Sequence, residues 1–421
     1  MPTSRMGILS IMFILSNLIR TMISLEMARA ATTERADQLI DFTSRIVASP
    51  SLSGEEGDVA ALIVAEMKSL NFDEVWTDEV GNIIGKINGD GGPTVMLNGH
   101  MDIVDPGPAD GWPHPAYSGK VVGDELWGRG SVDMKGPVAA MIYAAAQFKQ
   151  LNVRPAGDVL MTVAVMEEIA GLGSQFLATH TSADVAIVGE PSRNELRLGH
   201  RGRIELQVKF CGRSAHASAP DLAINPHYAA AKFLQRVETL SLQSDPVLGP
   251  ATIAPTLYLT DQVSANVIPS EVTVYLDWRN VPAETPELAL ETLQGLIEQT
   301  SDGATAQISV TKQPRRCYTG VTHDFASIFP PFATEPTSPL AVAAEKVIAE
   351  STGKPANPDV WQFATDGGHL ALAGIPIVGF GPGDDRLAHT NQERMSIQAL
   401  KTAAATYAPL ICDLAQAIES P

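Results

Sequence analysis

Two histidines and four acidic residues of this 421-residue chain follow apolar segments or lie in a loop after one. Imidazole nitrogens and carboxylate oxygens together form a ligand set that suits Zn²⁺, Co²⁺ or Mn²⁺. Coordination of two such cations leaves one carboxylate of the set free, and a free carboxylate beside a metal can act as a base. The six residues are His100, Asp133, Glu167, Glu168, Glu190 and His389.

The immediate surroundings of these residues add to the hypothesis. His100 lies in MLNGHMD, where Asp102 follows two positions later and points to the same side of an extended segment. A carboxylate in that position can orient a metal-binding imidazole. Glu167 and Glu168 are adjacent, and two neighbouring carboxylates are costly unless a cation separates their roles. Asp133 lies on the glycine-rich turn GRGSVDMKG before a long helix, where capping of that helix is the alternative role.

The elements that must position these side chains alternate between helices and strands in the first half of the chain. Helical spacing of apolar residues predicts helices at 33–47, 134–151 and 173–180, and a capping-box pattern of Ser53 and Glu56 predicts another that ends near residue 70. Apolar runs predict strands at 74–78, 82–87, 94–97, 159–165 and 183–188. This alternation is typical of an α/β fold with a mostly parallel sheet, in which ligands collect at the carboxyl ends of the strands.

Near residue 199 the pattern changes to longer alternating strands with two helices between them. Expected strands lie at 204–210, 251–259, 272–278 and 306–310, and expected helices at 229–240 and 286–298. Such an order suits a small antiparallel sheet with both helices on one face. We therefore expect a ferredoxin-like α+β domain at 199–312, inserted into an α/β domain made of residues 32–198 and 313–421. Helices at 339–350 and 396–418 and a strand at 375–380 complete the α/β domain.

Six motifs, HMD, GRGSVDMKG, MEEIAG, VGEPS, GRSAHASAP and AHTNQE, occur in this order along the chain. Together they resemble the M20 metallopeptidase family, particularly its branch of acetylornithine deacetylase and succinyl-diaminopimelate desuccinylase. The resemblance covers about residues 33–418. It implies a zinc-peptidase-like catalytic domain with two divalent metal ions, Zn²⁺ in preference to Co²⁺ or Mn²⁺. It also implies that the inserted domain is a lid that forms a homodimer.

The resemblance assigns a metal-binding role to five residues. Asp133 would bridge the two metals. His100 and Glu190 would complete one metal site, while Glu168 and His389 would complete the other.

Three further residues receive catalytic roles from the same resemblance. Glu167 would be the general base, and Asp102 would be the partner that orients His100. His216, in GRSAHASAP, matches a lid histidine that helps to polarise the scissile carbonyl, commonly in the active site of the partner subunit.

Four positions are expected to contact substrate. Asn266 in ANVIP and Arg279 in DWR resemble lid residues that do so in relatives. Gly367 and Gly368 lie in ATDGGHL, where successive glycine N–H groups can bind a substrate carboxylate, with a simple turn as the alternative.

The composition excludes several classes of protein. Lysine and arginine number 29 against 48 aspartate and glutamate, so the formal net charge is −19 and binding to nucleic acid or to anionic membranes is disfavoured. The three cysteines are widely spaced and odd in number, which excludes a disulfide framework and a cysteine-based zinc cluster.

Residues 1–31 form an N-terminal extension that differs from the rest of the chain. Its apolar run at 6–19 is shorter than the roughly 20 residues that a membrane span needs, so no span is expected. We favour a cytoplasmic protein, with Met27 as a second candidate start. An exported protein with a signal peptide that ends near Ala28-Arg29-Ala30 is the alternative.

The expected activity is metal-dependent hydrolysis of the amide bond of an N-acyl amino acid or a related small amide. A dipeptidase or carboxypeptidase of the same family is the alternative within this class. A catalytically silent binding module is the alternative from another class, and the presence of all six metal-site residues argues against it.

Overall fold

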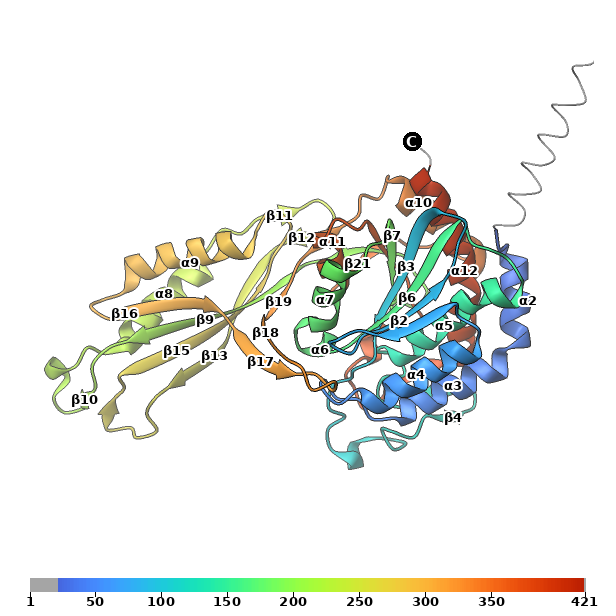
Figure 1. The fold of residues 1–421 in the computed structure, drawn as a ribbon. Helices are drawn as coiled ribbons and strands as arrows, with labels where there is room; N and C mark the ends of the chain where they lie inside the picture. Colours follow the sequence, from blue (N-terminus) through green and yellow to red (C-terminus); the bar gives the residue numbers. More distant parts are fainter. Residues whose placement is uncertain (1–21, 420–421) are drawn as a thin grey trace, which may run out of the picture.

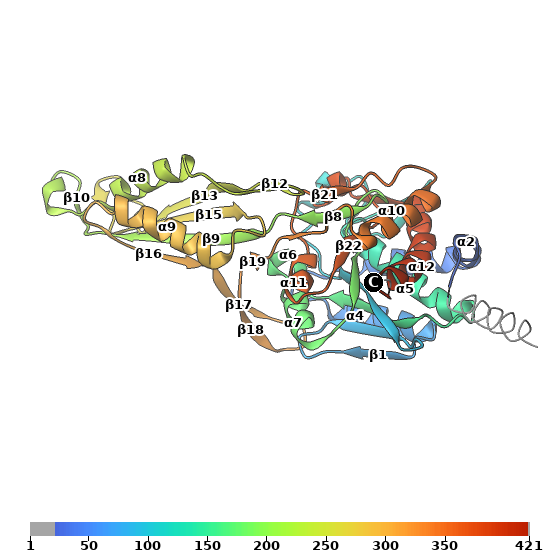
Figure 2. The ribbon, with the colours of Figure 1, turned by 90° about the horizontal axis from the view of Figure 1, so that it is seen from above.

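The computed structural model describes residues 22–419, which form two unequal parts (Figure 1). The larger part is an α/β domain, and the smaller inserted domain extends away from it as a sheet with two helices; Figure 2 shows the same separation from above. The signal-like run at 6–19 lies outside the described residues. Among the residues described, no helix is both long and apolar enough to cross a bilayer.

The α/β domain is built on a mixed nine-stranded sheet. Its central strands β6, β3, β7 and β22 are parallel, and the strands toward the two edges pair antiparallel, except that β21 is parallel to β8. The α/β class and the mostly parallel centre are therefore confirmed. In spatial order the strands are β1 (Glu74–Thr77), β2 (Ile83–Ile87), β6 (Gly157–Ala164), β3 (Gly92–His100), β7 (Val185–Val188), β22 (Ile377–Gly379), β8 (Arg197–His200) and β20 (Phe332–Ala333), with β21 (Asp359–Trp361) beside β8.

Strand β3 shows why both faces of this sheet are covered. Val95 and Leu97 belong to the main core cluster, whereas Met96 between them belongs to a second cluster on the opposite face. Helices α5 (Lys135–Gln150) and α12 (Ile397–Glu419) pack together on the first face, and α7 (Leu172–His180) pairs with α11 (Gly367–Leu372) on the other (Figure 1). The helices that complete the first layer are α2 (Leu25–Glu34), α3 (Ala36–Ala48), α4 (Gly57–Ser69) and α10 (Pro339–Thr352).

Helix α5 lies deepest in this layer. Its sequence KGPVAAMIYAAAQFKQ is rich in alanine, which has the highest helix propensity and lets neighbouring helices approach closely. Every residue from Lys135 to Phe148 is buried. The helix therefore fixes the turn that precedes it, which carries Asp133.

The inserted domain is a ferredoxin-like α+β unit. Its main sheet has the antiparallel order β13-β15-β9-β16, and α8 (Pro226–Glu238) and α9 (Pro286–Thr300) pack together against it. Inward-facing residues alternate along β9 from Ile204 to Phe210 and form a core with Phe233 of α8 and Leu293 of α9. The strands are β9 (Arg203–Cys211), β13 (Thr252–Thr260), β15 (Glu271–Arg279) and β16 (Thr305–Val310).

The chain crosses between the two domains at residues 201–202, between β8 and β9. It returns later than the expected boundary after residue 312, because β19 (Ile328–Phe329) still pairs with β9 before β20 joins β8. A hairpin of β17 (Lys312–Arg316) and β18 (Thr322–Ala326) lies between these points. Its Tyr318 donates a hydrogen bond to the carbonyl oxygen of Gly81 at 2.9 Å, so the hairpin contacts the α/β domain.

The N-terminal border of the α/β domain also differs from the expected one at residue 32. Helix α2 begins at Leu25, and its N-cap Ser24 accepts a hydrogen bond from the N–H of Met27. Ile23 and Ala28 are buried in the main core cluster. Residues 23–31 thus pack as part of the α/β domain rather than as an extension from it.

The capping-box prediction for Ser53 and Glu56 is wrong. Helix α4 begins at Gly57, and the hydroxyl of Ser53 instead donates to Oδ2 of Asp102 at 2.7 Å. The buried carboxylate of Glu56 accepts hydrogen bonds from the N–H groups of Gly54 (2.9 Å) and Met166 (3.2 Å). Both side chains therefore support the segments around the candidate site instead of a helix end.

Candidate metal centre

The carboxyl ends of three adjacent parallel strands bring the candidate ligands to one edge of the sheet. His100 is the last residue of β3, Glu190 follows β7, and Glu167 and Glu168 begin the short helix α6 (Glu167–Ala170) after β6. Asp133 lies on the turn before α5 and joins them at the same edge. His389 comes from the loop between β22 and β23 (Arg394–Ser396).

Asp133 lies between the two histidines. Its Oδ1 is 3.1 Å from Nε2 of His100, and its Oδ2 is 3.1 Å from Nε2 of His389. Glu190 Oε1 lies 3.6 Å from Nε2 of His100, and Glu168 Oε2 lies 3.1 Å from Nε2 of His389. The N-cap of α5 is Met134, so the alternative capping role of Asp133 is not the one the structure shows.

Two groups of three ligand atoms result, and they share Asp133. One group is His100, Asp133 and Glu190, and the other is Asp133, Glu168 and His389. Within each group all ligand atoms lie within 4.8 Å of one another. Imidazole nitrogens combined with carboxylate oxygens at this spacing fit a pair of divalent cations.

The electrostatic environment also suits cations. Burial, together with the nearby carboxylate of Asp133, raises the pKa of Glu190 well above its usual value. Hydrogen bonds from the imidazole of His389 to the carboxylates of Asp133 and Glu168 raise the pKa of His389 to about 10, so the two carboxylates favour a positive charge at that position. Several carboxylates this close together are costly unless cations neutralise them.

The two groups differ in their exposure. The side chain of His100 is 1% exposed and that of Glu190 is 3%, whereas the side chain of His389 is 52% exposed. The group that contains His389 therefore borders the solvent, from which a substrate would approach.

Glu167 lies beside the ligand groups but belongs to neither of them. It is buried, and burial raises its pKa well above the usual value, with Glu190, Asp366 and Glu168 adding to the effect. An uncoordinated carboxylate with a raised pKa next to a metal site has the properties of a general base.

Asp102 makes more contacts than a partner of His100 alone. Nδ1 of His100 lies 3.0 Å from the backbone carbonyl oxygen of Asp102 and 3.4 Å from its Oδ1. The carboxylate accepts hydrogen bonds from the N–H groups of Glu167 (3.0 Å) and Glu168 (3.1 Å) and from Ser53. Asp102 thus positions both glutamates as well as the imidazole.

Glu393 was not recognised in the sequence as a functional residue, although it ends the motif AHTNQE that supplied His389. It is fully buried, and its Oε1 accepts hydrogen bonds from the N–H groups of Gly130, Val132 and Asp133 at 2.9–3.1 Å. Its other oxygen pairs with the guanidinium of Arg129. Glu393 therefore holds the turn that carries Asp133.

The glycines proposed as a carboxylate-binding turn are already engaged. The N–H of Gly367 donates to Oγ1 of Thr365 (3.1 Å) and that of Gly368 to its carbonyl oxygen (3.3 Å). Both glycines are buried, and a Cβ on Gly368 would lie 1.8 Å from the carbonyl oxygen of Pro330. The two glycines thus form the first turn of α11, and neither the open loop nor the simple turn expected from the sequence describes this segment.

The lid residues lie in two different places. His216 belongs to β10 (Ala215–His216), at the tip of the inserted domain far from the α/β domain (Figures 1 and 2). Asn266 is close to it, because its carbonyl oxygen accepts the N–H of Ala217 at 2.9 Å. Arg279 is at the opposite end of the inserted domain, where its Nε donates to Asp277 at 2.6 Å. Within one chain these residues do not meet the candidate ligands.

Paired histidine–carboxylate clusters at the carboxyl edge of an α/β sheet, with an inserted α+β domain, define the chain as a metallohydrolase. It belongs to peptidase family M20/M25/M40, whose sequence model matches residues 96–413.

Individual relatives agree with this membership. YgeY of Escherichia coli strain K12, described as uncharacterized, is 30% identical over 375 residues, which cover 88% of this chain and 92% of that protein. The succinyl-diaminopimelate desuccinylase of Stenotrophomonas maltophilia (strain R551-3) is 26% identical over 392 residues, 89% of this chain and 98% of that enzyme. Aminopeptidase PepT from Bacillus cereus ATCC 10987 has the same fold in its crystal structure, with a TM-score of 0.71 at 19% identity. The superposition covers 90% of this chain and 99% of the PepT chain.

Proposed function

We propose that the protein is a deacylase that hydrolyses the amide bond of an N-acyl amino acid or a closely related small amide. One observation carries the proposal: two three-residue ligand groups share Asp133, and Glu167 lies beside them without joining either. The likeness to a succinyl-diaminopimelate desuccinylase over 89% of the chain supports a deacylase over other members of the family.

The residues of the site have separate roles in the proposed amide hydrolysis. When bound, two divalent cations lower the pKa of a water molecule and polarise the carbonyl oxygen of the amide. Glu167 takes the proton of the attacking water and returns it to the leaving nitrogen. The carboxylate of Asp102 holds Glu167 in place by accepting a hydrogen bond from the backbone N–H of Glu167. Zn²⁺ is the proposed native metal, with Co²⁺ or Mn²⁺ as alternatives, because all three accept imidazole and carboxylate ligands.

We further propose that the active enzyme is a homodimer in which His216 of one subunit serves the site of the other. Strand β13 is at the edge of its sheet, and its side chains Leu257 and Leu259 are 54% and 50% exposed. A long apolar edge strand of this kind is a surface on which a second copy can pair. Because His216 lies at the far tip of the inserted domain, in a dimer it would contact the metal site of the partner subunit rather than that of its own chain.

The cytoplasmic location is also a proposal. Cys211 and Cys317 are free thiols, as is usual for proteins of a reducing compartment. Cell fractionation with an antibody against the full chain tests it, and recovery from the periplasm or the medium would contradict it.

Two other functions remain as outcomes of the test. A dipeptidase or carboxypeptidase of the same family has the same metal chemistry and differs in the substrate. A silent binding module has no turnover at all.

A substrate screen distinguishes these functions. The protein, loaded with Zn²⁺ or Co²⁺, is incubated with N-acetyl and N-succinyl amino acids and with dipeptides that have a free amino terminus. Release of free amine is measured with and without a chelator. We expect chelator-sensitive hydrolysis with the higher kcat/KM for the N-acyl amino acids. Faster hydrolysis of the dipeptides would replace the deacylase with a peptidase, and no hydrolysis with any substrate would favour the binding module.

A further inference from the structure

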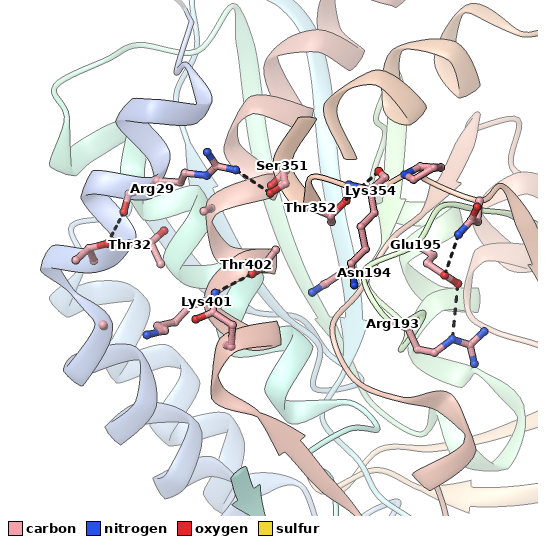
Figure 3. A pocket seen from close by; sticks show the side chains of 16 residues that line it. Arg29, Thr32, Arg193, Asn194, Glu195, Ser351, Thr352, Lys354, Lys401 and Thr402 are labelled. Carbon is pink, nitrogen blue, oxygen red and sulfur yellow. Dashed lines mark hydrogen bonds and ion pairs between the residues drawn. The ribbon is translucent and has the colours of Figure 1, made fainter. Parts of the chain in front are cut away.

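A cavity of about 780 Å³ lies between α2, the C-terminal end of α10 and the first turns of α12 (Figure 3). The segment 193–195, which follows the candidate ligand Glu190, forms another part of its wall. None of the proposed metal ligands or substrate-binding residues lines it. Its volume is within the range of small-molecule sites, about 300–1,000 Å³.

The lining of this cavity is basic, although the chain as a whole has a net charge of −19. It contains four cationic side chains and one carboxylate. These are Arg29, Arg193, Lys354, Lys401 and Glu195.

Two of the five charges are neutralised by neighbours. The guanidinium of Arg193 pairs with Asp385 at 2.5 Å, and Glu195 pairs with Arg197 at 3.2 Å. Glu195 also accepts a hydrogen bond from the amide of Asn357 at 3.3 Å. The only carboxylate of the lining is thus engaged by groups other than the remaining three cations.

Among residues 22–419, those three cations have no carboxylate partner. Nη2 of Arg29 donates to the backbone carbonyl oxygen of Ser351 at 2.8 Å, at the C-terminal end of α10, and this contact holds the guanidinium at the cavity without neutralising it. The ammonium groups of Lys354 and Lys401, which also line the cavity, form no ion pair within the described part of the chain. Figure 3 shows the three side chains around one hollow, Arg29 on α2, Lys354 on the loop after α10 and Lys401 on α12. Like charges gathered in this way repel one another unless an anion lies between them.

Within the described chain, Asn194 gives the cavity an unpaired hydrogen-bond acceptor in addition to its positive charges. It lines the cavity, its Nδ2 donates to the carbonyl oxygen of Ala399, and its buried Oδ1 has no hydrogen-bond partner among the described residues. A buried acceptor of this kind costs free energy unless a donor reaches it. A ligand that carries a hydroxyl group as well as negative charges would satisfy both features.

We propose that this cavity binds a small multivalent anion, a hydroxylated phosphate ester or polycarboxylate, through Arg29, Lys354 and Lys401. Three uncompensated cations match two to three negative charges, and the Asn194 oxygen accepts a hydrogen bond from the ligand. The site is separate from the metal centre, and its occupancy does not depend on the proposed hydrolase activity.

Calorimetric titration of the full, metal-loaded chain tests the proposal. Fructose 1,6-bisphosphate and citrate are the two probes; both carry hydroxyl groups, so they show whether phosphate or carboxylate groups are preferred. The variant K354Q/K401Q removes two of the three cations. The matched control K68Q/K120Q makes the same change in net charge at two exposed lysines outside the cavity.

We expect one saturable site for at least one probe, with an affinity that falls as salt is added, because the contacts are partly exposed charges. The dissociation constant should rise about tenfold or more in K354Q/K401Q and stay unchanged in K68Q/K120Q. Equal binding by both variants would mean that the probe occupies another place, such as the metal centre, and would overturn the proposal. Absence of binding by either probe to the unaltered chain would overturn it as well.

Discussion

The carboxylate of Glu393 accepts a hydrogen bond from the backbone N–H of Asp133 at 3.1 Å, between residues 260 positions apart in the sequence. Because the same oxygen also binds the N–H groups of Gly130 and Val132, one buried side chain holds the whole turn that presents the shared carboxylate to both ligand groups.

Replacement of Glu393 by alanine should weaken metal binding although Glu393 is not a ligand. The change removes the acceptor of three backbone N–H groups and the carboxylate partner of the buried Arg129, so Asp133 loses its fixed position. We expect a loss of about 10- to 100-fold in metal affinity, measured by competition with a chromogenic chelator. Glu125→Gln, which removes a partly buried ion pair with Arg394, is the control and should bind metal normally. Normal metal affinity in Glu393→Ala would show that the turn is held by other contacts.

Substitutions of Glu167 and of Asp133 should distinguish a loss of catalysis from a loss of metal binding. Glu167→Ala is expected to keep both metals and to lose turnover, because this carboxylate lies outside both ligand groups. Asp133→Ala should lose metal as well as activity, because its two oxygens face His100 and His389. Metal content by atomic emission and amine release are the two measurements. Turnover retained by a metal-replete Glu167→Ala protein would remove Glu167 from the role of general base.

The position of His216 at the tip of the inserted domain predicts complementation between subunits. His216→Ala should lower kcat by about 10²- to 10³-fold with normal metal content, as for other donors to a developing oxyanion. Glu167→Ala and His216→Ala chains, inactive alone, should regain about a quarter of the original activity when mixed and refolded in equal amounts, because half of the dimers then hold one complete site. Mixtures that stay inactive, with hybrid dimers shown by co-purification of two differently tagged chains, would contradict a role for His216 in the partner's site.

A buried histidine at the crossing between the domains should make stability depend on pH. Nε2 of His200 accepts the N–H of Thr365 at 3.1 Å, and burial lowers its pKa to about 4. Since the unfolded chain binds a proton near pH 6.5, the free energy of unfolding falls as the pH drops from about 6.5 to 4, by up to about 3 kcal/mol from this group. Urea unfolding of His200→Gln should show a shallower pH dependence in this window. His180→Gln, at an exposed position, is the control and should keep the original slope.

The fold class and the order of most elements could be predicted from the sequence because both depend on local patterns. Apolar runs mark β3, β6 and β7, and the alternation along β9 marks an antiparallel sheet with one buried face. The candidate ligands follow from the same patterns, because the side chains after parallel neighbouring strands must meet at one edge of the sheet.

The hydrogen bonds that hold the candidate ligands in position could not be predicted from local patterns. Ser53 and Glu56 have the spacing of a capping box, yet Ser53 binds Asp102 and Glu56 binds the N–H of Met166, 110 positions away. Glu393 is in a recognised motif, but its partners lie more than 250 residues earlier. Hydrogen bonds of this kind depend on which loops the packed helices bring together, and no local pattern encodes that.

The sequence by itself determined that imidazole and carboxylate side chains stand after the strands of an α/β sheet, since strand periodicity and residue type are properties of short segments. Only the tertiary structure decided that Asp133 faces both histidines, that His216 and Asn266 share a tip remote from them, and that Arg29, Lys354 and Lys401 surround one cavity. Each of these arrangements joins segments far apart in the chain, and their meeting is set by the packing of whole elements against a common core.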